Sequence, residues 1–281
     1  CDAATGNKLH SETDFAGGFG IPSFQRFYNS LSTRDDGLGT GWSHSLNKRL
    51  LIAATQIQYV GGNGSVITFT KSGSSWVAGA DIHAHLTVSN GYYTITSTDG
   101  SIEVFNPKGL PVTDTDPRGL VTTYVFSDDG FLQSVTGPFG HKITLTWYGT
   151  GLTTATFPDG SWVKFVRDAK YNLASATRAD TVVAAGVVTQ YLYEDTANPL
   201  SLTGIVDENS SRFATYAYDS TTGKAVSTQH AGATGKFTLA YNGNQTVITD
   251  AIGNTQTLTF ANSLGINLLV SRTDSSDGKT R

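Results

Sequence analysis

Apolar and polar residues alternate with a period of two along much of the chain. The segments Ser65–Thr70 (SVITFT), Tyr92–Thr96 (YYTIT) and Lys142–Trp147 (KITLTW) all show this alternation. Successive side chains of a β-strand point to opposite faces, so period two predicts strands with one buried face. The apolar segment Ala179–Val188 is rich in Val and is interrupted by Gly186, so we predict no helix of more than two turns.

Short turns that contain glycine separate the predicted strands. Glycine adopts the positive φ angles that tight hairpin turns require, and Asn-Gly and Asp-Gly are typical of such turns. The pairs are Asn63-Gly64, Asn90-Gly91, Asp99-Gly100, Asp129-Gly130, Asp159-Gly160, Asn242-Gly243 and Asp277-Gly278. The sequence therefore predicts an all-β fold of antiparallel hairpins, with strands of about 5 to 8 residues.

The turn glycines also recur at a regular distance. Gly100, Gly119, Gly140 and Gly160 are separated by 19, 21 and 20 residues. A period near 20 indicates an internal repeat, and each unit contains a turn, a strand, a second turn and a second strand. A two-stranded unit cannot bury its apolar face alone, so we expect the units to continue one curved or spiral sheet.

Composition narrows the class of protein. The formal net charge is -4 and the pI is near 5.8, which argues against a nucleic-acid binder because such proteins carry a basic face. Charged residues make up only 15% of a chain with 31 glycines, which is typical of a secreted β protein. No apolar run approaches the roughly 18 residues that a membrane-spanning helix needs.

The start of the chain suggests a piece of a longer protein. There is no Met and no signal-peptide pattern, so we do not expect position 1 to be a translated N-terminus. Cys1 is the only cysteine and can form no internal disulfide, which leaves the redox compartment open. A lipid-modified N-terminal cysteine is the alternative to a fragment boundary.

Two groups of residues resemble the bacterial RHS (rearrangement hot spot) proteins. The segment FATYAYDSTTGK resembles their YD repeat, and the diverged segment VTTYVFSDDGFL is similar, with Phe126 at the place of the second Tyr. The repeat positions are Tyr216, Tyr218, Asp219 and Gly223 in the first segment and Tyr124, Asp128 and Gly130 in the second.

The second resemblance lies near the start of the chain. The segments ATGNKLHSETDF, FQRFYNS and LGTGWSHSL look like the part of an RHS core that precedes its repeats. The matching positions are Gly6, Asn7, Lys8, Glu12, Thr13, Asp14, Tyr28, Asn29, Ser30, Gly39, Gly41, Trp42 and His44. We therefore expect residues 1–60 to open the core, residues 61–112 to form hairpins, and residues 113–281 to form YD-like repeats with an insertion near 179–198.

The resemblance implies a scaffold without cofactors. RHS repeats wind into a hollow shell that encloses a C-terminal toxin domain, and the protein is exported by a secretion system or displayed at the bacterial surface. The implied partners are the rest of the polypeptide and that toxin. A piece of such a shell would be an open curved sheet with at least one exposed edge, so self-association is also expected.

Candidate chemical sites are few. The spacing of His83 and His85 would place both on one face of a strand, where two imidazoles could share a metal ion, but no third ligand is evident and a solvated face is favoured. We interpret Trp42 as a core or end-capping aromatic residue and His44 as its hydrogen-bonded neighbour. Acidic turn residues Asp128, Asp129, Asp207 and Glu208 lack the ligand density of a calcium loop, so solvated turns are favoured.

The sequence Asp116-Pro117-Arg118-Gly119 is similar to the DPxG segment associated with self-cleavage in RHS proteins. It occupies the same register as Gly137-Pro138-Phe139-Gly140 in the next unit. A turn with Pro at its second position and Gly at its end explains both segments, so we expect the cleavage segment to lie outside this chain.

No other enzyme motif is present. There is no Gly-x-Ser-x-Gly sequence, and Gly17-Gly18-Phe19-Gly20 precedes Pro22 rather than a helix. We therefore predict no catalytic residues. Aromatic residues of the repeats would form a sugar-binding strip if exposed, but packing between units is favoured. They are Trp147, Tyr148, Trp162, Phe165, Tyr191, Tyr193, Tyr216, Tyr218 and Tyr241.

Two functional hypotheses follow. The first is a non-catalytic shell segment that encloses or presents a polymorphic toxin in bacterial competition. The alternative is a cell-surface or extracellular YD-repeat protein that binds carbohydrate or assembles into filaments through its sheet edges.

Overall fold

The computed structural model describes residues 1–180, 185–263 and 266–275. These residues form 25 strands and one short 3-10 helix, η1 (Ala231–Ala233), which confirms the all-β prediction. No helix in these ranges is long and apolar enough to span a membrane. Residues 181–184 of the predicted insertion and the predicted Asp277-Gly278 turn lie outside the described residues.

The strands form an inner sheet of three and an outer sheet of 22. The inner sheet consists of β1 (Leu9–Phe15), β2 (Phe24–Asn29) and β3 (Trp42–His44). The outer sheet begins with β4 (Arg49–Ile52), β5 (Gln56–Val60), β6 (Val66–Ser72), β7 (Ser75–Val77), β8 (Ala84–Ser89), β9 (Tyr92–Ser97), β10 (Ile102–Phe105) and β11 (Pro111–Thr115). It continues with β12 (Val121–Phe126), β13 (Leu132–Thr136), β14 (Lys142–Tyr148), β15 (Gly151–Thr156), β16 (Trp162–Arg167), β17 (Leu173–Ala179) and β18 (Val187–Leu192). The last strands are β19 (Gly204–Val206), β20 (Arg212–Tyr218), β21 (Ala225–His230), β22 (Phe237–Asn242), β23 (Gln245–Thr249), β24 (Thr255–Ser263) and β25 (Ile266–Asp274).

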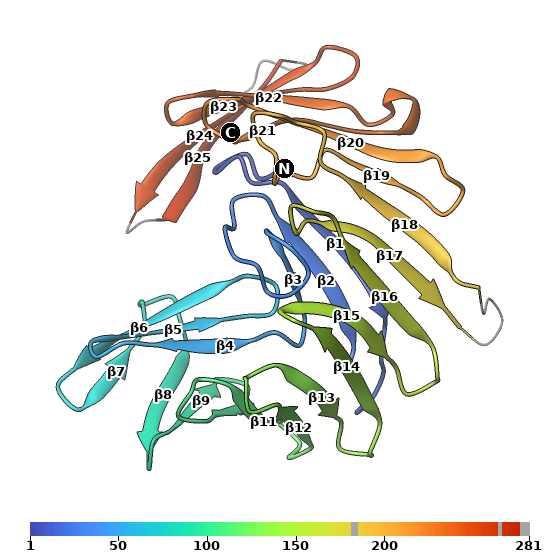
Figure 1. Cartoon of the computed structure of the whole chain (residues 1–281). Helices are drawn as coiled ribbons and strands as arrows, with labels where there is room; N and C mark the ends of the chain where they lie inside the picture. The colour runs from blue at the N-terminus through green and yellow to red at the C-terminus, as the bar shows by residue number, and fades with distance from the viewer. Residues whose placement is uncertain (181–184, 264–265, 276–281) are drawn as a thin grey trace.

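Every strand of the outer sheet pairs antiparallel with its neighbours in the sequence, from β4 to β25. Strands β4 and β25 lie apart at the two ends of this curved sheet (Figure 1), and no pairing between them occurs within the described residues. The sheet is therefore open, as the repeat pattern predicted. The first end is partly covered, because the backbone N–H of Leu50 donates to the carbonyl of Gly109 at 2.8 Å.

The curvature has a local cause that recurs in the repeats. The pairing register shifts between Val125 and Phe126, between Thr146 and Trp147, and between Val166 and Arg167. An extra residue on one strand of a pair bends that strand and increases its twist. Repetition of this irregularity in successive hairpins therefore bends the sheet toward one face.

The inner sheet lies on the concave face of the outer sheet (Figure 1). The main core combines inner-sheet residues with inward-facing residues of β13 to β21. Its largest fully buried side chains are Phe24, Tyr28, Leu38, Trp42, Ile143, Leu152, Leu173 and Leu202. A smaller core lies on the first strands of the outer sheet, β4 to β10. It consists of Leu50, Ile57, Phe69, Leu86, Ile95 and Phe105.

Candidate functional site: the polar interface between the two sheets

Strand β2 contributes a charged side chain to an apolar core. Phe24, Arg26 and Tyr28 alternate along the strand and are all buried, with Arg26 wholly inaccessible to solvent. The period-two pattern that buries the two aromatic rings thus also places a guanidinium group between the sheets. An isolated buried charge is costly, so its partners determine whether this interface is stable.

Arg26 is fully engaged by two carboxylates and a phenol. Its Nε donates to Asp14 Oδ2 at 2.6 Å and its Nη2 to Asp14 Oδ1 at 3.0 Å, which is a bidentate pair. Nη2 also donates to Glu12 Oε2 at 2.6 Å, and Nη1 donates to the Tyr191 hydroxyl at 2.7 Å. Because Glu12 and Asp14 lie on β1 and Tyr191 lies on β18, this cluster joins the inner sheet to the repeats.

The cluster is closed by further contacts. The Tyr191 hydroxyl donates to Glu12 Oε2 at 2.7 Å, and His10 Nε2 lies 2.9 Å from Glu12 Oε1. The Arg26 guanidinium also lies 5.4 Å from the centre of the Phe165 ring, within the range of a cation–π interaction. The Arg26 guanidinium, both carboxylates and the Tyr191 hydroxyl thus all have partners within the protein, and the cluster holds the two sheets together.

The electrostatic environment keeps both members of the Glu12–Arg26 pair charged. Burial would raise the pKa of Glu12, but the Arg26 guanidinium and the hydrogen bonds from His10 and Tyr191 outweigh it and lower this pKa to about 2. Burial would lower the pKa of Arg26, but Tyr191, Asp14 and Glu12 hold it well above its usual value. Burial is also the main reason that the pKa of Tyr191 lies well above its usual range. The ion pair therefore persists at neutral pH.

A second polar contact connects the opening motif with the repeat motif. The Tyr28 hydroxyl accepts the backbone N–H of Leu202 at 2.9 Å, and the Tyr218 hydroxyl donates to the Leu202 carbonyl at 2.8 Å. The Trp42 indole donates to the Tyr193 hydroxyl at 2.9 Å. Tyr28 and Trp42, from the segments that resemble the opening of an RHS core, thus lie with the YD-repeat residue Tyr218 around the loop between β18 and β19.

The N-terminal residues extend this interface to β21. The Lys8 ammonium lies 3.9 Å above the Tyr216 ring, and burial lowers its pKa to about 8. The backbone N–H of Ala225 donates to the carbonyl of Gly6 at 2.8 Å. A side chain at Gly6 would meet Lys224 Cβ at 2.6 Å, so the close approach of these backbones requires glycine.

The remaining opening-motif residues shape the inner sheet itself. Asn7 Oδ1 accepts the Ser30 hydroxyl at 3.1 Å, and the N–H of Asn29 donates to the Gly41 carbonyl at 2.8 Å. Thr13 pairs with Gln25 across β1 and β2. A side chain on Gly39 would lie 2.7 Å from the backbone of Leu173, so this glycine lets the inner chain approach β17 closely.

The interpretation of His44 as a hydrogen-bonded neighbour of Trp42 was wrong. His44 is fully buried, neither ring nitrogen has a hydrogen-bond partner in the described structure, and its ring stacks on Phe24 with centroids 5.1 Å apart. Burial, opposed by Asp36, lowers the pKa of His44 to about 4, so the ring is neutral and acts as an aromatic core residue. Trp42 uses its one donor on Tyr193, which the sequence could not indicate.

The other predicted residues lie away from this interface. Tyr124 donates to Asp114 at 2.5 Å, while Asp128 is exposed and Gly130 half-buried in the turn that follows β12. Asp219 Oδ1 accepts the backbone N–H of Thr222 at 2.7 Å in the turn that Gly223 completes with a φ of 68°.

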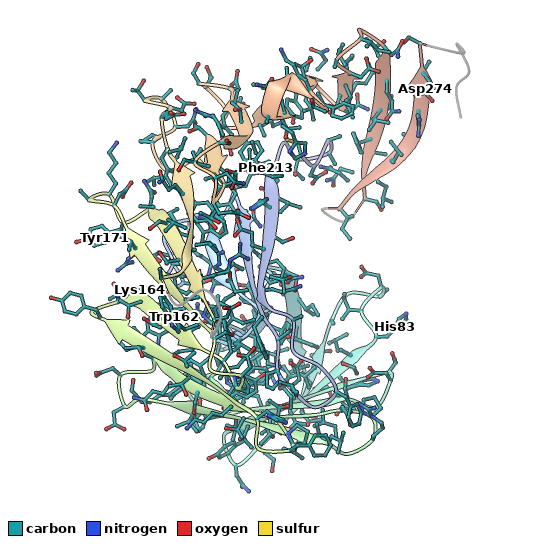
Figure 2. All side chains as sticks on the ribbon, turned by 90° about the vertical axis from the view of Figure 1, so that its right-hand side faces the viewer. His83, Trp162, Lys164, Tyr171, Phe213 and Asp274 are labelled. Atoms are coloured by element: carbon teal, nitrogen blue, oxygen red, sulfur yellow. The ribbon has the colours of Figure 1, made fainter. Side chains whose placement is uncertain are left out.

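The two histidines proposed as weak metal candidates also lie elsewhere. His83 precedes β8 and His85 lies within it, and both are exposed; Figure 2 places His83 at the periphery of the molecule. The described ranges contain no group of three or more His, Cys, Asp or Glu side chains arranged to hold a metal ion.

The Asp116-Pro117-Arg118-Gly119 segment forms the expected turn. The N–H of Gly119 donates to the Asp116 carbonyl at 2.9 Å, and Asp116 Oδ1 accepts the N–H groups of Arg118 and Leu120. These hydrogen bonds lower the pKa of Asp116, with the bond from Leu120 contributing most. The carboxylate stabilises its own turn.

The nine aromatic residues of the repeats differ in burial, and Trp147, Trp162, Tyr193 and Tyr241 are half-buried. Phe165, Tyr191, Tyr216 and Tyr218 are buried between the units and the inner sheet. Tyr148 is 85% exposed, which the packing interpretation did not predict. It follows the half-buried Trp147 on β14, and the two-residue period of the strand directs it to the opposite, solvent-exposed face.

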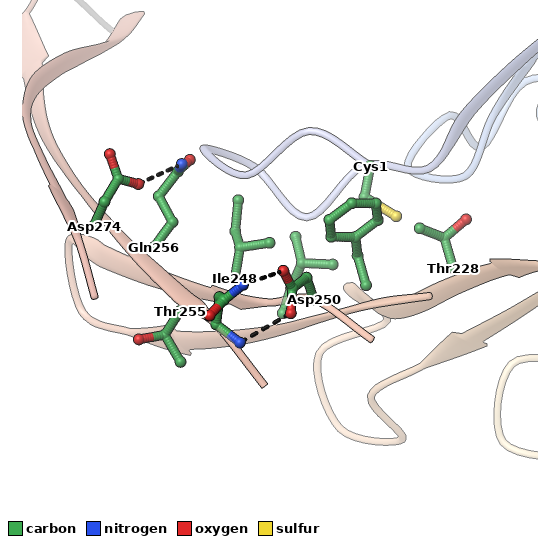
Figure 3. Close-up of a pocket in the computed structure, with 10 residues that line it drawn as sticks. Cys1, Thr228, Ile248, Asp250, Thr255, Gln256 and Asp274 are labelled. Carbon is green, nitrogen blue, oxygen red and sulfur yellow. Dashed lines mark hydrogen bonds between the residues drawn. The ribbon is translucent and has the colours of Figure 1, made fainter. Parts of the chain in front are cut away.

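A hollow remains on the concave face beyond the inner sheet. It has a volume of about 430 Å³ and lies between Cys1 and the last strands, as Figure 3 shows. Its acidic residues form local contacts, because Asp250 Oδ1 accepts the N–H of Asn254 at 2.9 Å and Asp274 accepts the Gln256 amide at 2.8 Å. These contacts organise turns and a strand pair.

Comparison with known proteins gives a family match for part of the chain. Residues 1–69, about a quarter of the sequence, match the model of a family described as a domain of unknown function, DUF6531. No curated protein matches this sequence.

Several solved structures have limited similarity to the chain. The crystal structure of TcdB2-TccC3-TEV has 10% identity and a TM-score of 0.38 over 92% of this chain and 20% of the other. The Photorhabdus luminescens Tc holotoxin pore has 12% identity and a TM-score of 0.39, over 94% of this chain and 15% of the other. The chain spans a fifth or less of the length of these solved chains.

Proposed function

We propose that this chain is the opening segment of an RHS-type β-repeat shell, and that it encloses or presents a polymorphic toxin outside the producing bacterium. In this proposal the chain has no catalytic role and needs no cofactor. Its partners are further repeats of the same polypeptide and an enclosed C-terminal domain. Its task is to close one end of the shell and to set the path of the sheet.

One observation carries this proposal: residues of the opening motif fill the concave face at one part of the sheet only. Arg26 attaches the inner sheet to β18, and Tyr28 and Trp42 attach it to the loop between β18 and β19, whereas β22 to β25 extend beyond it. A sheet whose concave face is filled over β13 to β21 and hollow over β22 to β25 has the shape expected of the closed end of a container. The resemblance of both motifs to RHS proteins supports this interpretation.

The reading frame that encodes this chain tests the proposal. We expect further strand-turn-strand units after Arg281, followed by an unrelated domain. Limited proteolysis of the full-length product should leave that domain intact while the shell is folded and degrade it after the shell is unfolded. A reading frame that ends soon after Arg281, or a domain cleaved at the same rate in both states, would contradict a shell.

A second candidate function is extracellular self-assembly or carbohydrate binding. The observation that favours it is the last strand, β25, on which Ile266, Leu268, Leu269 and Val270 are each at least half exposed. An apolar strand at a sheet edge is a template for pairing with another chain. Fibres or rings of the purified chain in electron micrographs would support this function. Binding on a glycan array that requires the exposed residues Tyr148 and Tyr171 would also support it; Figure 2 shows Tyr171 at the surface.

A further inference from the structure

A second polar cluster lies where the inner sheet passes into the outer sheet. Lys48 occupies the short connection between β3 and β4, and its ammonium group forms ion pairs with Glu103 on β10 and Asp114 on β11. The distance from Lys48 Nζ to Asp114 Oδ2 is 2.5 Å. Glu103 and Asp114 are directly paired in the register of β10 and β11, so the sheet itself places two carboxyl groups around one amine.

Two tyrosine hydroxyls complete the cluster. Tyr124 donates to the same Asp114 Oδ2 at 2.5 Å, and Tyr59 donates to Glu103 Oε1 at 3.3 Å. The side chain of Lys48 is only 11% exposed, and the second oxygen of Asp114, Oδ1, is buried without a hydrogen-bond partner. Strong donors thus hold one oxygen of this carboxylate, and none holds the other. A buried oxygen without a partner is unfavourable, so an ion pair alone does not explain this arrangement.

We propose that Lys48 and Asp114 form an intramolecular isopeptide bond. Lys48 Nζ attacks Asp114 Cγ, and the bond between Cγ and Oδ2 breaks. Two of the three ammonium protons leave with Oδ2 as one water molecule, and Oδ1 becomes the carbonyl oxygen of the new amide. The step is balanced without any oxidant, reductant or further reactant.

The neighbouring groups have distinct roles in this step. Glu103, in contact with Nζ, accepts a proton from the ammonium group and returns it to the departing oxygen. The Tyr124 hydroxyl donates a hydrogen bond to that oxygen and assists its departure, as positioned acids and bases do in enzymes. Asp114 is the carboxyl that reacts, because its leaving oxygen has a donor at 2.5 Å whereas the corresponding donor to Glu103 lies at 3.3 Å.

The fold supplies the driving force that two free side chains lack. Groups held in reactive contact have effective concentrations of about 10⁵ M or more, which favours condensation over hydrolysis. The bond would join positions 48 and 114, and every residue of the smaller core, from Leu50 to Phe105, lies between them. It would therefore lock the segment that joins the inner sheet to the repeats. This inference is independent of the proposed function.

Intact-mass spectrometry of the purified chain tests the proposal. We expect a mass about 18 Da below the value calculated from the sequence, which is the loss of one water. After tryptic digestion, residues 35–49 should be joined to residues 109–118, because trypsin does not cut after an acylated Lys48. A folded chain of full mass that releases residues 35–48 and 109–118 as separate peptides would overturn the proposal.

Two variants sharpen this test. Lys48→Arg keeps the positive charge but cannot form the amide, so it should have the full mass. A loss of water that persists in Lys48→Arg would come from succinimide formation at an Asp-Gly pair and would count against the bond. Glu103→Gln, with folding verified by circular dichroism, should form the cross-link at least about 100-fold more slowly. Formation at the original rate in this folded variant would overturn the role of Glu103.

Discussion

The concave face of the outer sheet is filled over β13 to β21 and open over β22 to β25. In the filled region, Val163 and Phe165 of β16 are buried to 96% or more. In the open region, no residue of β24 or β25 is buried among those described, although both strands carry apolar side chains. The difference shows that the repeat hairpins do not bury their own apolar face, and that the inner sheet does so for one part of the molecule.

The largest expected effect comes from removing the charge that joins the two sheets. Arg26→Met leaves the Glu12 and Asp14 carboxylates without their cation in the interior, and loss of one partner of a buried ion pair costs about 3 to 5 kcal/mol. We expect a decrease in the free energy of unfolding at the upper end of this range, measured by urea denaturation.

The matched control lies in the open region. Arg272 pairs with Asp274 on β25 and its side chain is 51% exposed. Arg272→Met should cost less than about 1 kcal/mol, as for other exposed ion pairs. Equal effects of the two substitutions would show that the inner interface does not hold the fold together.

Truncation of an aromatic ring compares the two regions directly. Phe165 is 4% exposed in the filled region and Phe237 is 43% exposed in the open one. Phe165→Ala should lower the free energy of unfolding by about 3 to 4 kcal/mol because it leaves a cavity, whereas Phe237→Ala should cost less than about 1 kcal/mol. Thermal and urea unfolding of both variants measure the difference, and similar costs would contradict the comparison.

Acid should weaken the filled region more than the open one. The pKa of Glu12 is lowered to about 2 in the folded chain, so its stabilisation is present above about pH 4.5 and is lost as the pH falls toward 2. The expected loss is about 2 to 3 kcal/mol. Urea denaturation at several pH values tests this, and Glu12→Gln should show a shallower dependence between pH 4.5 and 2. An unchanged pH dependence of stability in Glu12→Gln would show that Glu12 does not cause the loss of stability in acid.

Much of the fold is predictable from local patterns. Period-two alternation and Asn-Gly or Asp-Gly turns depend on neighbours in the sequence, so hairpins such as β15–β16, which turns at Asp159-Gly160, were expected. The recurrence of turns predicted one continuous open sheet. The arrangement of the two sheets was not predictable in this way, because β1 pairs with β2 but then packs on strands more than 100 residues further along the chain.

The central residue of the candidate site was missed for the same reason. Arg26 stands in the sequence FQRFYN and resembles an ordinary surface charge on a strand. Two features of the sequence could have indicated that Arg26 is buried. It shares a strand face with Phe24 and Tyr28, and two carboxylates stand two residues apart in the preceding strand. Tyr191, its third partner, lies 165 residues away, and no local pattern indicates that contact.

Amide hydrogen exchange resolved by strand tests the central claim most directly. If the inner sheet and β13 to β21 form one cooperative unit, amides of β2 should exchange as slowly as those of β16, at a rate set by global unfolding. Amides of β24 and β25 should exchange at least about 100-fold faster, because no inner sheet covers them. Fast exchange throughout β2 with slow exchange in β16, or equal protection of β16 and β25, would contradict the account.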